Sequence, residues 1–290
     1  MVGGARLICQ AAFLSYNHSA NLGYPRYPSP MVETVLITGA SSGIGLELAR
    51  VFASQKVNLI LTARSQPQLE QVAAALRITS KVQVTVLPCD LSKPGEAELL
   101  FAKVQHLGLQ VDVLVNNAGF GLYGHFKDTS LARELEMIQL NIVAVTTLTK
   151  LVLPGMVARN HGRILNIAST AAFQAGPLMA VYYATKAYVL HFSEAIANEL
   201  QGTGVTVTAL CPGPTESAFV GNAKLETSKL FHNKKVPTAA QVAREGYNAM
   251  MAGKTLEIVG VRNRFYALMA RLLPRQLMIS AVRQAQDPIR

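Results

Sequence analysis

Hydrophobic residues along the chain gather in short runs, and longer amphipathic segments separate these runs. The runs are rich in Val, Ile and Leu, which favours strands, whereas the spacing of apolar residues between them favours helices. Leu59, Ile60 and Leu61 are apolar at consecutive positions, which indicates a strand buried on both faces. The predicted strands are Val32–Thr38, Val57–Thr62, Val82–Leu87, Val111–Val115, Arg163–Ala168, Val205–Leu210 and Leu256–Val259.

This alternation predicts the fold class. Parallel strands need a long connection, usually a helix, so strands that alternate with helices favour a parallel sheet. We therefore expect an α/β fold, with a doubly wound, mainly parallel sheet of about seven strands and helices on both faces.

The domain organisation follows from where the pattern begins and ends. Residues 31–260 are expected to form a single domain, and residues 1–30, which lack periodicity, an irregular or disordered leader. The polar segment near 214–236 is expected to be a lid. Residues 261–290 combine leucines with six arginines, and we interpret them as a basic amphipathic extension. It can cover a pocket, pair with a second subunit or touch anionic lipid, and we favour these in that order.

Composition excludes several classes of function. The net charge is +10, but the basic residues are spread along the chain without the aromatic pattern of a nucleic-acid binder, so we expect no nucleic-acid partner. The three cysteines form no CxxC pair and the histidines no HExxH motif, so we expect neither a disulfide framework nor a catalytic metal. A reducing compartment, the cytoplasm, is predicted. Lys150, Pro154 and Arg271 interrupt the longest apolar stretches, which argues against a membrane span.

Polar and glycine-rich loops follow six of the predicted strands. Ligands of open α/β sheets bind outside the carboxyl ends of the strands, so these loops predict one shared site. The loops contain Gly39–Gly45, Arg64, Asp90, Asn116–Gly119, Ser169 and Pro212-Gly213.

The first loop has the features of a phosphate site. Its glycines permit a tight turn and a close approach of phosphate, and the helix that follows offers free N–H groups at the positive end of its dipole. Ser41 and Ser42 can add hydroxyl contacts. Together with Thr38, the segment Gly39, Ala40, Ser41, Ser42, Gly43, Ile44 and Gly45 reads TGxxxGxG. This pattern resembles the short-chain dehydrogenase/reductase family, whose motifs recur in order over about residues 32–260. The resemblance implies a Rossmann-type fold and an oxidoreductase with a nicotinamide cofactor.

The second and third strands bear on the choice of cofactor. Arg64 stands where an acidic residue usually holds the ribose hydroxyls of NAD, and an arginine can accommodate the 2′-phosphate of NADP, so NADP(H) is predicted. A surface cap is the alternative role for Arg64. Asp90 and Leu91 resemble the adenine-contacting pair of the family, although Asp90 alone is equally typical of a helix N-cap.

The fourth strand is followed by the family's NNAG motif. The resemblance implies that its amide side chains tie strand ends together beside the adenosine ribose. We assign Asn116 a mainly structural role and place Asn117, Ala118 and Gly119 nearer the cofactor.

Tyr182 and Lys186 are the candidate proton donor and its partner. They are four residues apart on a predicted helix, so they share one face, and the ammonium is expected to lower the pKa of the phenol. Lys186 can also bond the nicotinamide ribose. A second YxxxK match occurs at Tyr123 and Lys127, but it lies among glycines, where a regular helix is not expected.

Two more residues complete the implied catalytic set. The family has a serine thirteen residues before its tyrosine, which corresponds to Ser169. Ser169 would hydrogen-bond the substrate oxygen; Thr170 is its local rival and a helix cap the structural alternative. The resemblance assigns Asn141 a water-holding step in a proton relay, and a locally satisfied kink is the alternative.

The loop after the sixth strand resembles the family's nicotinamide-contacting loop. Pro212, Gly213, Thr215 and Ser217 are assigned to the cofactor, with Thr215 and Ser217 as the donors. The whole constellation predicts an NADP(H)-dependent ketone or aldehyde reductase acting on C=O or CH–OH groups. The alternatives are a 3-oxoacyl-thioester reductase and a non-catalytic NADPH-sensing protein.

The remaining expectations concern the substrate and the assembly. We expect an apolar pocket for a small carbonyl or alcohol substrate. The resemblance implies a dimer or tetramer formed through the long helices around Asn141 and Lys186. The residues predicted to line the pocket are Phe120, Leu122, Phe126, Phe173, Leu178, Met179 and Phe219.

Overall fold

The protein is represented by a computed structural model that describes residues 32–216 and 236–287. All the described strands and helices belong to one unit, which begins at Val32. The expected leader, nearly all of the expected lid, and the predicted site residues Ser217 and Phe219 lie outside the described residues.

Seven parallel strands form one sheet, in the order β3-β2-β1-β4-β5-β6-β7. Each lies within one residue of a predicted strand or inside it, so the predicted sheet is confirmed. β1 lies inside the sheet, between β2 and β4: Val35 pairs with Leu59 on one side and with Val113 on the other. The strands are β1 (Thr34–Thr38), β2 (Asn58–Thr62), β3 (Val84–Val86), β4 (Val113–Asn116), β5 (Gly162–Ile167), β6 (Val205–Cys211) and β7 (Leu256–Ile258).

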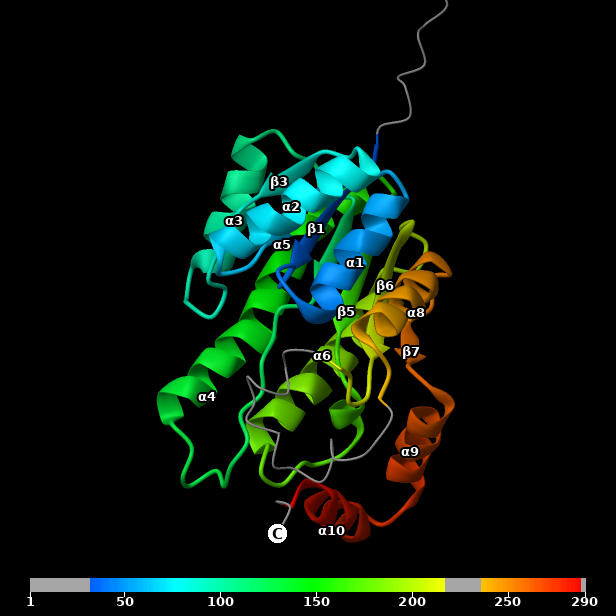
Figure 1. Ribbon diagram of the computed structural model, residues 1–290. Coiled ribbons are helices and arrows are strands. Elements are labelled where there is room, and N and C mark those ends of the chain that lie inside the picture. The colour runs from blue at the N-terminus through cyan, green and yellow to red at the C-terminus, as the bar shows by residue number, and fades with distance from the viewer. Residues whose placement is uncertain (1–31, 217–235, 288–290) are drawn as a thin grey trace, which may run out of the picture. The chain divides into compact units, whose positions relative to one another are not determined.

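Helices cover both faces of the sheet, as predicted (Figure 1). Successive side chains of β1 point to opposite faces of the sheet, so Val35 and Ile37 pack into one core and Leu36 packs into the other. The first core contains α1 (Gly43–Ser54), α2 (Gln66–Ser80) and α8 (Ala239–Met251). The second contains α3 (Glu96–His106), α5 (Ala144–Ala158) and α6 (Ala180–Glu199).

One long helical run includes a π-helical turn. It consists of α4 (Leu131–Ile138), the π-turn η1 (Gln139–Val143) and α5. By length and composition, Leu131–Ala158 is long and apolar enough for a membrane span, since an 18-residue window of it has a mean hydropathy of 1.6. Leu148, Val152 and Met156 of α5 are nevertheless buried in the second core, so this run also serves as a core helix of the domain.

Two further helices lie beyond the carboxyl ends of the strands. They are α9 (Val261–Leu272) and α10 (Arg275–Gln286), with Pro274 as the N-cap of α10. Figure 1 shows them below the sheet, on the side where the loops after the strands gather. A short 3₁₀ helix, η2 (Thr170–Phe173), follows β5 on this side. The predicted extension is therefore helical.

Candidate active site

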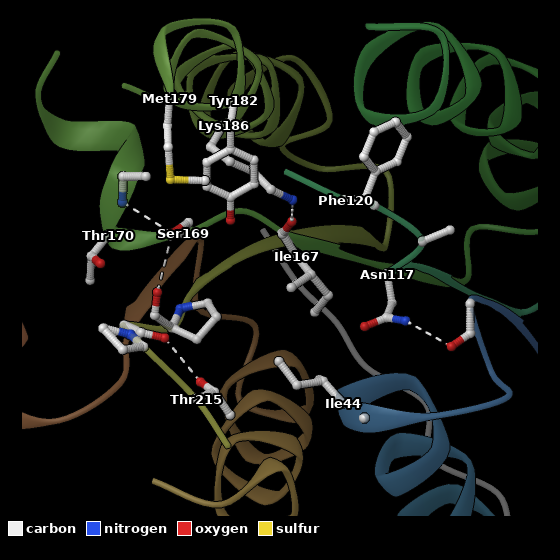
Figure 2. A pocket seen from close by; sticks show the side chains of 18 of the residues that line it. Ile44, Asn117, Phe120, Ile167, Ser169, Thr170, Met179, Tyr182, Lys186 and Thr215 are labelled. Carbon is white, nitrogen blue, oxygen red and sulfur yellow. Dashed lines mark hydrogen bonds between the residues drawn. The ribbon is translucent and has the colours of Figure 1, made fainter. Parts of the chain in front are cut away.

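One cavity of about 720 Å³ lies at the carboxyl edge of the sheet. The loops after β1, β2, β3, β4, β5 and β6 all contribute to its lining, so the predicted convergence of six loops is confirmed. This volume is typical of a ligand site. Figure 2 shows Ile44 from the first turn of α1, Asn117 from the fourth loop and Tyr182 from α6 around the same space.

The loop between β1 and α1 can exist only with glycine at certain positions. Gly39 and Gly43 have φ values of +66° and +56°, which other residues rarely adopt. A Cβ atom on Gly45 would lie 2.3 Å from the carbonyl oxygen of Gly39. Ser42 is the N-cap of α1, but its side chain makes no capping hydrogen bond. The first turn of α1 therefore offers N–H groups to an anion, and the loop fits the pyrophosphate of a dinucleotide.

The end of β4 is fastened to the end of β1. Asn117 Nδ2 donates to the carbonyl oxygen of Thr38 at 2.8 Å, and the amide of Ala118 donates to Thr38 Oγ1 at 2.9 Å. Asn116 instead points into the protein, where its Nδ2 donates to Asn166 Oδ1 at 2.8 Å. The structural role predicted for Asn116 is confirmed. Asn117, Ala118 and Gly119 line the cavity.

The cavity extends past the ends of β2 and β3. Arg64 and Ser65 line it at the start of α2, whose first turn contains no acidic residue. Asp90 and Leu91 also line it. Asp90 Oδ1 accepts hydrogen bonds from the amide and hydroxyl of Ser92, whereas the N-cap of α3 is Gly95. The alternative role of Asp90 as a helix N-cap is therefore wrong. Asp90 closes a turn, and this turn ends before α3 begins.

Tyr182 and Lys186 lie on one face of α6, as their spacing predicts. Lys186 Nζ is 5.9 Å from the centre of the Tyr182 ring and donates to the carbonyl oxygen of Ile167 at 2.7 Å. Figure 2 shows this bond and the Tyr182 hydroxyl directed into the cavity. Both side chains are buried, with exposed fractions of 9% and 6%. They line the wall where α6 passes the end of β5.

Ser169 hydrogen-bonds with Tyr182, which joins the loop after β5 to α6. Its Oγ also accepts from the amide of Ala171 at 3.1 Å, so Ser169 caps η2 as well. The helix-cap role considered for Ser169 is therefore confirmed, and its contact with the substrate oxygen stays a prediction. Thr170 lines the cavity next to it.

Burial governs the titration of Tyr182 and Lys186, the candidate catalytic pair. It raises the pKa of Tyr182 well above its usual value, and the hydrogen bond from Ser169 only partly opposes this. Burial also lowers the pKa of Lys186 to about 8. The expected lowering of the Tyr182 pKa by Lys186 is therefore wrong for the protein without cofactor, because burial raises this pKa and Ser169, not Lys186, is the group that opposes the rise.

Asn141 occupies the π-turn beneath the cavity. Its Nδ2 donates to the carbonyl oxygen of Phe120 at 3.0 Å and to Thr185 Oγ1 at 3.1 Å, and its Oδ1 accepts from the Phe120 amide at 3.3 Å. The side-chain amide of Asn141 is thus fully hydrogen-bonded to protein groups, as expected for the alternative role of a residue at a helix kink. A Cβ atom on Gly119 would lie 3.0 Å from Asn141 Oδ1 and 3.6 Å from Lys186 Nζ, so the three are neighbours. Among the described residues predicted for the site, Asn141 and Gly45 lie behind the cavity wall.

The second YxxxK match has no helical framework. Tyr123 and Lys127 lie in an irregular loop before α4, as predicted. Tyr123 Oη donates to the carbonyl oxygen of Gln286 at 2.5 Å, and Lys127 Nζ lies 3.1 Å from Asp128. Neither residue lines the cavity.

The loop after β6 contributes Pro212, Gly213 and Thr215 to the cavity. Thr215 is buried, and its Oγ1 donates to the carbonyl oxygen of Gly213 at 2.9 Å. Within the described residues no group of three or more potential metal ligands occurs.

The cavity wall opposite the sheet was only partly predicted. Of the apolar residues proposed for it, Phe120 and Met179 line the cavity. Leu122 and Phe173 do not, because they pack into neighbouring clusters, Leu178 is buried away from the lining, and Phe126 is 64% exposed. Nine of the lining residues that were not predicted come from the two C-terminal helices: Arg262, Asn263, Tyr266, Ala267, Met278, Ala281, Val282, Ala285 and Gln286. Covering the pocket, the favoured role of this extension, is confirmed.

Comparison with known proteins places this geometry in a family. Residues 33–228 match the family model described as short chain dehydrogenase. The ketoacyl reductase HetN of Nostoc is 32% identical over 242 residues, covering 83% of each chain.

Two solved structures are also similar. A short-chain dehydrogenase from Sphingobium yanoikuyae in complex with NADPH is 32% identical, has a TM-score of 0.75 and covers 88% of this chain and 98% of its own. A bulky-bulky ketone specific alcohol dehydrogenase from Comamonas testosteroni is 28% identical, with a TM-score of 0.71 and coverage of 88% and 97%. The match over most of the chain, with the glycine loop and the Ser-Tyr-Lys set in place, shows that this protein belongs to the short-chain dehydrogenase/reductase family of oxidoreductases.

Proposed function

We propose that the protein is an NADP(H)-dependent reductase of ketones or aldehydes, in which Tyr182 donates the proton. The observation that carries this proposal is that Ser169, Tyr182 and Lys186 face one cavity that also reaches the glycine loop of α1. Reduction of a carbonyl leaves negative charge on oxygen, so the site needs a hydrogen-bond donor and a proton source at that oxygen.

The three side chains divide this task. The Tyr182 hydroxyl holds its proton at neutral pH, because burial raises its pKa, and can deliver it to the substrate oxygen. The Ser169 hydroxyl fixes that oxygen beside Tyr182. Lys186 stays close to Tyr182 through its bond to the Ile167 carbonyl and favours transient negative charge on the phenol oxygen. The nicotinamide supplies the hydride when it is bound.

The preference for NADP(H) rests on the end of β2. Arg64 is exposed at the edge of the cavity, beside Ser65 and the N-terminus of α2. An arginine and the positive end of a helix both favour a phosphate, whereas a ribose hydroxyl pair would call for a carboxylate. The solved relative in complex with NADPH supports the same choice.

The substrate is proposed to be an apolar carbonyl compound. The wall formed by Met179, Met278 and Val282 suits aliphatic or aromatic groups, and a ketone-specific relative has a similar fold.

A second candidate is a 3-oxoacyl thioester. Arg133 lines the cavity with its guanidinium 4.6 Å from the Phe120 ring centre, where it can meet the phosphates of a thioester carrier. The ketoacyl reductase relative favours the same substrate.

We also propose that the protein is a cytoplasmic homo-oligomer. The run from α4 to α5 leaves Leu131 and Leu135 exposed, at 69% and 55%, and such apolar positions favour contact with a second copy. Light scattering of wild-type protein and of the Leu135→Asp variant tests this. A monomeric wild type would contradict it.

The decisive experiment compares substrates and cofactors in one assay. Purified protein is mixed with NADPH or NADH and with ketones, aldehydes and 3-oxoacyl thioesters, and loss of the reduced cofactor is followed. We expect turnover with NADPH and an apolar carbonyl compound. If Arg133→Gln lowers turnover of the thioester alone, the second candidate is favoured. NADPH binding without turnover of any compound would contradict both and indicate the non-catalytic sensing protein.

A further inference from the structure

Helix α9 has apolar side chains on the side that faces solvent. Val261, Phe265, Leu268 and Leu272 recur at intervals of four, three and four residues, so they share one face of the helix. Their exposed fractions are 81%, 57%, 51% and 67%. Ala267 on the opposite face is buried and lines the cavity. A surface helix normally has polar residues on its outer side, so the pattern of α9 requires an explanation.

The exposed apolar residues continue into α10. Leu273 and Leu277 are 43% and 60% exposed, on either side of Pro274. We call the set Val261, Phe265, Leu268, Leu272, Leu273 and Leu277 the outer apolar face.

Arginines border the outer apolar face. With 3.6 residues per turn, Arg264 and Arg271 lie about 70–90° from the centre of the stripe on one side, and Arg262 about 90° on the other. Val261–Asp287 contains five arginines and one acidic residue, Asp287. Arg271 and Arg275 have no carboxylate within ion-pair distance among the described residues, whereas Arg264 pairs with Glu257. Arg271 and Arg275 therefore leave positive charge without an ion-pair partner beside the outer apolar face.

We propose that the outer apolar face binds the surface of a membrane that contains anionic lipid. An apolar stripe edged by basic residues is the pattern of a helix that lies in the plane of a membrane, with its apolar side chains below the headgroups and its arginines at the phosphates. Charge selects this occupant over a second copy of the chain. A symmetric pairing through this face would bring the same arginines together, at a cost in repulsion.

The inner faces of α9 and α10 remain in use when the outer face is bound. Asn263 and Tyr266 of α9 and Val282 of α10 line the cavity. Phe265, Leu272 and Leu277 do not. The outer face can therefore be altered without a change in the cavity lining, and membrane binding can be measured independently of any reductase activity.

The test is co-sedimentation of the full chain with two kinds of vesicle, phosphatidylcholine alone and phosphatidylcholine mixed with phosphatidylglycerol. We expect binding to the mixed vesicles that weakens as salt increases. The double variant Phe265→Ser, Leu272→Ser should bind at least about tenfold more weakly, because two apolar anchors are lost. The double variant Arg271→Gln, Arg275→Gln should bind the mixed vesicles about fivefold more weakly for each arginine that is removed.

A matched control is the double variant Ile78→Ser, Leu99→Ser, which removes two exposed apolar residues of α2 and α3. It should bind as wild type does. Thermal unfolding by circular dichroism should show all variants folded. Wild-type protein that ignores mixed vesicles, or a control variant that loses as much binding as the α9 variant, would overturn the proposal. So would a concentration-dependent dimer that Phe265→Ser, Leu272→Ser dissociates while vesicles are not bound, which would assign the face to a second copy.

Discussion

Gln286 donates a hydrogen bond through its side-chain amide to Tyr183 Oη, although 103 residues separate them. Gln286 is fully buried at the end of α10, and its backbone carbonyl accepts from Tyr123 Oη. Burial raises the pKa of Tyr183 to about 12, so its hydroxyl stays protonated. The residue next to the proposed proton donor in sequence thus fastens the C-terminal helix that forms part of the cavity wall.

Replacing Gln286 with alanine should loosen that wall. We expect the free energy of unfolding to fall by about 1–3 kcal/mol, because a buried hydrogen bond to Tyr183 is lost. KM for an apolar carbonyl substrate should rise more than kcat falls. Gln284→Ala, on the exposed side of the same helix, is the matched control and should resemble wild type. Urea unfolding and steady-state kinetics measure both effects. Equal behaviour of the two variants would contradict the fastening role.

Removing the Ser169 hydroxyl should impair both the substrate contact and the titration of Tyr182. Because the Ser169 hydrogen bond lowers the pKa of Tyr182, its loss should raise that pKa further. We expect Ser169→Ala to reduce kcat by about 10²–10³-fold, as for other lost donors to a reacting oxygen. In alcohol oxidation, the rate increases with pH as Tyr182 loses its proton, and for Ser169→Ala this increase should occur at higher pH than for wild type. Thr170→Val tests the neighbouring hydroxyl and should stay within a few-fold of wild type. A larger loss in Thr170→Val than in Ser169→Ala would reassign the role.

Lys186 should make stability depend on pH in a predictable direction. The usual pKa of 10.5 holds in the unfolded chain, whereas burial lowers the pKa to about 8 in the folded protein. Between these values the unfolded state binds more protons, so raising the pH favours the folded state. Between about pH 7.5 and 9.5, the free energy of unfolding of wild type without cofactor should increase by on the order of 2 kcal/mol relative to that of Lys186→Met. Chemical unfolding of both proteins across this range measures the difference. A constant difference would show that the Lys186 pKa is not lowered.

Arg64 should determine the choice between the two nicotinamide dinucleotides. We expect Arg64→Ala to lower kcat/KM for NADPH by about 10–100-fold, the usual cost of a lost charged hydrogen bond, and to leave the value for NADH nearly unchanged. Arg50→Ala removes an exposed arginine of α1 that pairs with Glu47, and it serves as the control. An equal loss for both cofactors would contradict binding of the 2′-phosphate by Arg64.

Local patterns in the sequence predict most of this fold and of the cofactor side of the site. The strands are predictable because their apolar runs are continuous, and the loops after them contain the polar residues. Gly39 and Gly45 are predictable because they belong to the TGxxxGxG pattern. The structure explains this pattern, since close packing with Asn117 and the loop backbone leaves no room for a side chain at either position. Tyr182 is distinguishable from Tyr123 because only Tyr182 lies on a regular helix.

What sequence patterns could not predict depends on contacts between distant segments. The place of Gln286 is fixed by Tyr183 and Tyr123, and nothing near Gln286 in the sequence indicates either partner. The direction of the Tyr182 pKa depends on how completely the fold buries the hydroxyl, which the YxxxK spacing does not specify. The partners of Asn141 in the π-turn, Phe120 and Thr185, likewise lie 21 and 44 residues away in the sequence.

The most direct test of the central claim compares two tyrosine variants in the NADPH oxidation assay. Tyr182→Phe removes the hydroxyl that faces the cavity, and Tyr123→Phe removes that of the second YxxxK match. We predict that Tyr182→Phe lowers kcat by about 10²–10⁴-fold, the usual contribution of a positioned acid, while still binding NADPH. Tyr123→Phe should stay within a few-fold of wild type. Full turnover by Tyr182→Phe, or a larger loss of turnover in Tyr123→Phe than in Tyr182→Phe, would contradict the assignment of Tyr182 as the proton donor.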